Sequence, residues 1–104
     1  MNPEQRDAAA IFLTHGIGDS ISTILAYRSV GSDGEANPVI RYFLEIGEIP
    51  AAMVILVAVG VASILWPTAA RSVGRGRSRY VAAGIVTLSV TIVTINLVVA
   101  LDLL

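Results

Sequence analysis

The sequence predicts an all-α membrane protein: a three-transmembrane-helix bundle with a short amphipathic helix in the loop that joins the first two spans. Of the 104 residues, 55% are hydrophobic and only 14% are charged, whereas a soluble domain carries about 25% charged residues. The hydrophobic residues lie in three long runs, and each run has about the 20 residues that a helix needs to cross the hydrocarbon core. A single membrane domain over residues 1–104 is therefore expected.

The first predicted span covers residues 8–27 and is bounded by Asp7 and Arg28. At 1.5 Å per residue it reaches about 30 Å, the thickness of the hydrocarbon core. Asn2 suits an N-cap and Pro3 suits the first helical position, so the helix is expected to begin before the span itself.

The second span is predicted at residues 49–70, where Trp66 would be an interfacial anchor and Pro67 a helix terminator. The third span is predicted at residues 80–101, with Tyr80 at the interface. Its alternation of apolar and hydroxyl residues also fits a strand. A lone strand cannot satisfy its backbone in lipid, so a helix is predicted.

The distribution of arginine predicts the orientation. The loop of residues 71–79 is basic and contains no acid, whereas the loop of residues 28–48 carries two Arg against four acids. The positive-inside rule then places the amino terminus in the cytoplasm and the carboxyl terminus outside. Orientation alone explains the basic inner loop, although it would also suit anionic lipid. Its basic residues are Arg71, Arg75, Arg77 and Arg79.

The outer loop, residues 28–48, has room for structure outside the bilayer. GSDGEANP is typical of a turn, after which Asn37 and Pro38 fit an N-cap and a first helical position. An amphipathic helix on the outer surface is expected to follow and to end near Gly47. Glu35 and Asn37 are interpreted as turn and cap residues, with an outer recognition patch as the alternative.

Asp19 is predicted near the bilayer midplane, where an acid costs about 2.5–3.5 kcal/mol. His15 lies one turn away on the same face, close enough to donate to the carboxylate. Spans one and three run in the same direction, so residues at equal depth in the two spans can be identified by counting from the start of each. The two spans are expected to pack in parallel, with span two covering the outside. The polar seam between them is predicted to contain His15, Asp19, Ser22, Thr23, Thr87, Thr91, Thr94 and Asn96.

Two interpretations of His15 and Asp19 stay open. They either hold the helices together, or they form a proton or cation site. A metal site would need a third ligand, and Glu35 is expected at a different depth, so no metal is predicted. No cofactor is predicted either.

Composition narrows the function classes. The sequence has no cysteine, which excludes disulfides and thiol chemistry. Its net charge of −1 argues against nucleic-acid binding. There is no nucleophile with a base and no phosphate loop, so an enzyme is not predicted.

The residues Asp19, Ser22-Thr23, Gly31 and Glu35-Ala36-Asn37-Pro38 form a spaced pattern over roughly residues 15–45. This pattern resembles a family of small, uncharacterised multi-span membrane proteins from archaea and bacteria. The resemblance implies a membrane fold and brings no activity.

The leading hypothesis is a small structural or accessory subunit of a larger membrane assembly, either a cellular complex or a virion's internal membrane. Such a subunit would contact membrane lipid and pack against itself or other membrane proteins. The alternative is a subunit of an oligomeric proton or cation channel or transporter, in which His15 and Asp19 line the pathway.

Overall fold

The computed structural model describes residues 1–102, which are almost entirely helical and contain no strand. The first rod is continuous from Pro3 to Val30. The elements in chain order are α1 (Pro3–Ile11), the π-helical segment η1 (Phe12–Gly18), α2 (Asp19–Val30), the 3-10 turn η2 (Ser32–Gly34), α3 (Pro38–Ile46), α4 (Glu48–Val73) and α5 (Arg75–Ala100).

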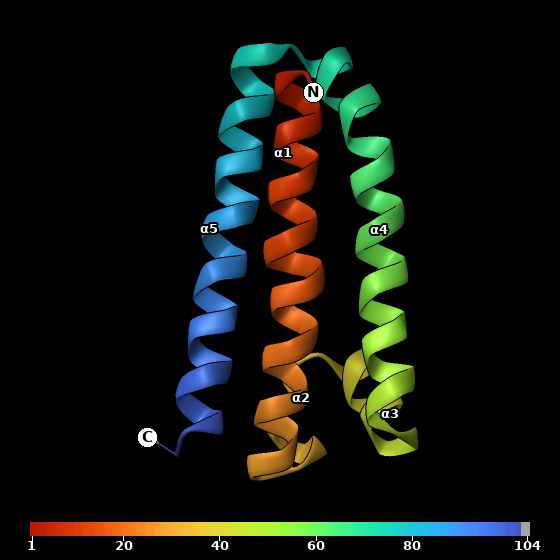
Figure 1. The fold of residues 1–104 in the computed structure, drawn as a ribbon, viewed down its shortest axis with the longest axis vertical. Helices are drawn as coiled ribbons and strands as arrows, with labels where there is room; N and C mark the ends of the chain where they lie inside the picture. Colours follow the sequence, from red (N-terminus) through yellow and green to blue (C-terminus); the bar gives the residue numbers. More distant parts are fainter. Residues whose placement is uncertain (103–104) are drawn as a thin grey trace.

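Three rods are long and apolar enough to cross a membrane: Pro3–Val30, Glu48–Val73 and Arg75–Ala100. The chain is therefore a small multi-pass membrane protein, and the predicted all-α class is confirmed. The first rod lies between α4 and α5, with α5 parallel and α4 antiparallel to it (Figure 1). The predicted parallel pairing of spans one and three is thus present, but α4 packs on the other side of the first rod instead of covering that pair.

Capping explains where the helices begin. The Asn2 side chain accepts from the Gln5 backbone N–H at 2.8 Å, and the Gln5 side chain accepts from the Asn2 N–H at 2.9 Å. This reciprocal pair satisfies two of the free donors of the first turn, with Pro3 at the first helical position. At the other end of the bundle, Gly47 is extended and separates α3 from α4.

Two boundary predictions are wrong. Pro67 does not end the second span, since α4 continues to Val73. A proline in a transmembrane helix costs one backbone hydrogen bond, which the surrounding helix tolerates. The predicted basic loop of residues 71–79 is also helical except for Gly74, where φ is +94°. Glycine adopts this conformation without steric cost, so one residue reverses the chain.

The amphipathic helix α3 is present, and its apolar face covers the bundle. Leu44 is almost fully buried, and α3 lies beside the first turns of α4 (Figure 1). The end of the bundle that carries residues 28–48 is called the loop end below. The end that carries residues 71–79 is called the Arg-rich end.

The apolar core joins all three spans. Trp66, the predicted interfacial anchor, packs against this core, and α4 continues beyond it to Val73. The core residues are Ile11, Ile55, Val59 and Ala82, with Phe12, Ile40, Trp66, Ile85 and Val86 packed against them.

Small residues let the first rod approach both of its neighbours. A Cβ at Gly16 would lie 3.5 Å from Val59 of α4, and a Cβ at Gly18 would lie 3.4 Å from Val93 of α5. Close backbone approach through small residues is how transmembrane helices gain packing energy.

Candidate functional site

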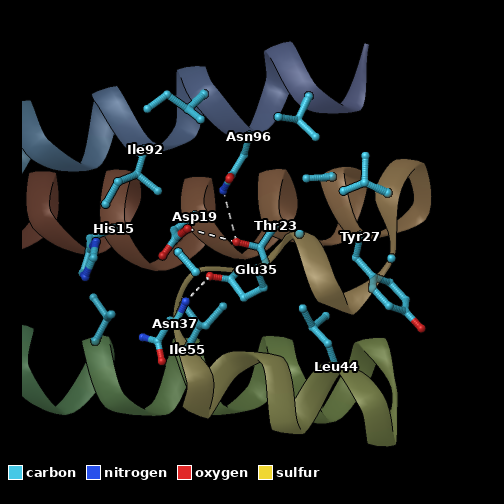
Figure 2. Close-up of a pocket in the computed structure, with 18 residues that line it drawn as sticks. His15, Asp19, Thr23, Tyr27, Glu35, Asn37, Leu44, Ile55, Ile92 and Asn96 are labelled. Carbon is cyan, nitrogen blue, oxygen red and sulfur yellow. Dashed lines mark hydrogen bonds between the residues drawn. The ribbon is translucent and has the colours of Figure 1, made fainter. Parts of the chain in front are cut away.

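A cavity of about 440 Å³ lies between the three spans in the loop-end half of the bundle (Figure 2). Its volume falls within the range of small-molecule sites. Its lining combines polar residues with aliphatic residues from α2, α3, α4 and α5. The polar lining residues are His15, Asp19, Thr23, Tyr27, Glu35, Asn37 and Asn96.

The first rod contributes His15 and Asp19 through a change of helical geometry. Residues Phe12–Gly18 form a π-helical segment, in which the Asp19 N–H reaches back to the Thr14 carbonyl five residues earlier. Wide turns of this kind occur often at functional sites. His15 lies inside the segment, and Asp19 is the first residue after it.

A chain of hydrogen bonds connects α5 to Asp19. The Asn96 amide nitrogen donates to Thr23 Oγ1 at 3.2 Å and to Ser22 Oγ at 3.1 Å. Thr23 Oγ1 in turn donates to Asp19 Oδ1 at 3.0 Å, as Figure 2 shows. The predicted polar seam between the first rod and α5 therefore exists around Asp19, and four of its predicted members form one hydrogen-bond network. No described residue donates to the second carboxylate oxygen of Asp19.

The loop of residues 28–48 brings a second acid into the cavity. Glu35 enters from the segment between η2 and α3 and extends toward the face of the first rod that carries Asp19 and Thr23 (Figure 2). Glu35 was expected apart from Asp19, and the two side chains line the same cavity. The amphipathic helix folds against α4, so the turn before it reaches inward.

Hydrogen bonds hold this turn in place. The Arg41 guanidinium donates to the Glu35 carbonyl oxygen at 2.6 and 3.0 Å, and the Glu35 carboxylate accepts from the Asn37 N–H at 3.0 Å. Asn37 caps α3 by accepting from the Val39 and Ile40 N–H groups, with Pro38 at the first position. The predicted turn and cap are present, and Glu35 and Asn37 line the cavity as well.

His15 is not bonded to Asp19. Its Nδ1 atom is buried and has no partner among the described residues, so the predicted donation to the carboxylate is absent. The π-helical segment explains this, because it changes the angle between the two side chains from that of a regular helix. The imidazole lines the cavity instead.

The three predicted threonines of the third span do not face the seam. Thr87, Thr91 and Thr94 are exposed, and the hydroxyls of Thr91 and Thr94 donate to carbonyls four residues back in their own helix. Their depth was predicted from residue counting, which carries no information about direction around the helix axis.

The face of α5 that meets the first rod is a different one. Ser78, Ala82 and Ser89 are buried there, with Ile85, Ile92 and Asn96 partly buried. These positions are separated by four, three, four, three and four residues, which is the seam spacing of packed helices. Sequence reasoning missed this face, although small residues at this spacing were a usable signal.

The lining residues of the cavity extend from His15 to the loop end. Ile11 and Ala82 of the apolar core lie on the Arg-rich side of His15. At that end Arg75 lies 3.3 Å from Glu4, while Arg71, Arg77 and Arg79 are exposed. The described residues contain no group of three His, Asp or Glu side chains placed to hold a metal ion. The arrangement suits a ligand that enters from the loop end.

A comparison with protein families places this fold and site. Residues 10–102 match the family described as "Domain of unknown function (DUF5658)". No curated protein and no solved structure matches the chain. The matched residues include most of the first span, the other two spans and every residue of the cavity, so the chain belongs to the DUF5658 family.

Proposed function

We propose that this chain binds a cation, the proton included, in the cavity at Asp19 and works as the binding subunit of an oligomeric membrane channel or transporter. The observation that carries the proposal is the meeting of His15, Asp19 and Glu35 in one cavity within the membrane-spanning bundle. Ionisable residues in such a place are costly, and they typically mark ion and proton pathways.

Charge balance supports a cation. Asp19 and Glu35 line the cavity, and neither Arg nor Lys lines it. Two carboxylates without a basic side chain in the lining make the cavity attractive to a positive charge. His15 adds a third ionisable side chain to the same lining.

The cavity lining ends at His15 and does not run through the whole bundle, which favours a binding site over an open pore. The arginine distribution favours an orientation with the amino terminus in the cytoplasm and the carboxyl terminus outside. In this orientation the loop end faces the outside, and the ligand enters the cavity from there. The proposal is one of binding and translocation and assigns no chemical reaction to the chain.

The test is ion flux into vesicles that contain the purified protein. A pH-sensitive dye reports proton uptake under an imposed membrane potential, and radiolabelled sodium reports the metal ion. We expect Asp19→Asn to abolish flux while the oligomer mass stays unchanged. Thr91→Val, a change of a lipid-side hydroxyl at the same depth, is the matched control and should conduct as the natural protein does. Flux that survives Asp19→Asn would refute the proposal, and so would a natural protein that neither conducts these ions nor binds any cation in the cavity.

A second candidate function is a structural or accessory subunit of a larger assembly, cellular or viral. The exposed side chains Thr87, Thr91 and Thr94 favour it, because polar residues on a lipid-facing helix side are typical of helix–helix contacts. Native mass spectrometry on particles released by mild detergent is the test. A stoichiometric complex with another protein supports this function, and a particle that contains this chain alone contradicts it.

A further inference from the structure

We propose that the ligand of the cavity is a small organic ammonium ion with an apolar body, recognised by Asp19 and Glu35 together. This inference rests on the proposed function and names the chemical class of its cation. It follows from three features of the cavity: its size, the composition of its lining, and the unused polar atoms of the lining residues.

Size excludes a bare metal ion as the best-fitting occupant. The cavity measures about 440 Å³, and a water molecule takes about 30 Å³ of liquid, so the space corresponds to roughly fifteen waters. A dehydrated monovalent ion would leave most of this volume empty. The nearby side chains also lack the three acidic or imidazole ligands of a metal site within the described part of the chain.

The lining contains two acids among many aliphatic residues. Asp19 belongs to the first rod and Glu35 to the turn before α3, and the aliphatic residues come from α2, α3, α4 and α5. A mainly apolar lining with two charged groups matches a molecule with a charged head and an apolar body. The aliphatic lining residues are Val30, Leu44, Ile55, Val59, Ile92, Ile95 and Val99.

The acids have capacity for an ammonium group. Asp19 accepts one hydroxyl through Oδ1, and Glu35 accepts one backbone N–H through Oε1. Each carboxylate therefore keeps an oxygen for which no described residue supplies a donor. An ammonium group has three N–H donors and can bind both. His15 also lines the cavity, and its Nδ1 atom is buried without a partner among the described residues.

The outer turn determines how the ligand is enclosed. Glu35 lies on a segment held by Arg41 through two hydrogen bonds to its carbonyl. The second acid therefore comes from a loop, and the first comes from a rigid helix. A ligand that binds both acids would connect the loop to the first span and close the loop end over itself.

The test uses the full chain in lipid nanodiscs and measures binding calorimetrically, with heats from empty nanodiscs subtracted. The probe is benzylammonium, and benzyl alcohol is the uncharged control of the same shape. We expect saturable binding of benzylammonium and none of benzyl alcohol. Glu35→Gln should weaken binding roughly ten- to hundredfold, the range for one charged hydrogen bond. The control Glu45→Gln changes an exposed acid of α3 outside the cavity and should leave affinity unchanged.

The results of the binding and flux measurements test the organic ligand and the proposed function separately. Equal heats for benzylammonium and benzyl alcohol, or undiminished binding by Glu35→Gln, would overturn the inference. Protein that transports protons or sodium with Asp19 intact but does not bind benzylammonium would refute the organic ligand and leave the proposed function standing. Protein that does neither would refute both. The Asp19→Asn variant should also lose benzylammonium binding. If that variant fails to fold, Glu35→Gln still tests the inference, because Glu35 lies on the loop and not in a span.

Discussion

Asn96 is expected to contribute more to the stability of the bundle than any other polar side chain of α5. Its amide donates to Ser22 Oγ and Thr23 Oγ1 of the first rod. Interhelical hydrogen bonds in a membrane protein contribute about 0.6 kcal/mol each on average, with a maximum of about 1.7. Replacement by a leucine of similar size removes both bonds and keeps the packing volume. Asn96→Leu should therefore lower the free energy of unfolding by about 1–2 kcal/mol.

Thr91→Val is the matched control, because Thr91 donates only to the Thr87 carbonyl of its own helix and is exposed. Its effect should stay within about 0.5 kcal/mol. The assay is reversible unfolding by sodium dodecyl sulfate in mixed micelles, followed by the fluorescence of the single tryptophan. A double-mutant cycle between Asn96→Leu and Thr23→Val should give a coupling of about 0.6 kcal/mol. Equal costs for Asn96→Leu and Thr91→Val would show that the assigned face of α5 is wrong.

Three further predictions concern the turns and the orientation. Gly74→Ala should cost about 1–3 kcal/mol in the same unfolding assay, because φ is +94° there. Gly76→Ala, a helical position with open space around it, should be neutral or stabilising by up to about 1 kcal/mol, and equal losses at both sites would contradict this account. Asn37→Ala should cost about 1 kcal/mol of local stability and speed hydrogen exchange at the Val39 and Ile40 amides, whereas Asn37→Asp should keep the cap and the slow exchange. The natural chain has no cysteine, so a membrane-impermeant maleimide should label Asp33→Cys only from outside the cell and Ser72→Cys only after permeabilisation; labelling of both from one side would refute the three-span topology.

Much of the fold could be predicted because the bilayer restricts it. Lipid offers no partner for backbone groups, so three apolar runs of sufficient length become three helices. The helix caps could also be predicted, because a cap satisfies free backbone N–H donors of its own helix whatever the surroundings. The two caps are at Asn2-Pro3 and Asn37-Pro38. Helix ends were harder, because Pro67 and the arginines at positions 71–79 indicated a loop while the chain needed only Gly74 to turn.

The candidate site was predicted in part. Counting residues from the membrane surface fixes depth, and it correctly matched Asn96 to the outer part of the first span. It does not fix direction around the helix axis, so it also selected Thr87, Thr91 and Thr94, which point outward. Burial of Ser89 and Asn96 follows instead from the three- and four-residue spacing of the contact face.

The π-helical segment and the inward turn share one reason for being missed. Helical periodicity assumes a constant turn, and residues Phe12–Gly18 break that assumption directly before Asp19. An amphipathic pattern in residues 38–46 shows that one face will be buried, but it does not say whether lipid or the protein covers it. In this chain α4 covers it at Leu44, and the preceding turn therefore enters the bundle with Glu35. Both acids reach the cavity through tertiary contacts, and for that reason the pairing of Asp19 with Glu35 is a property of the fold that no local stretch of the sequence carries.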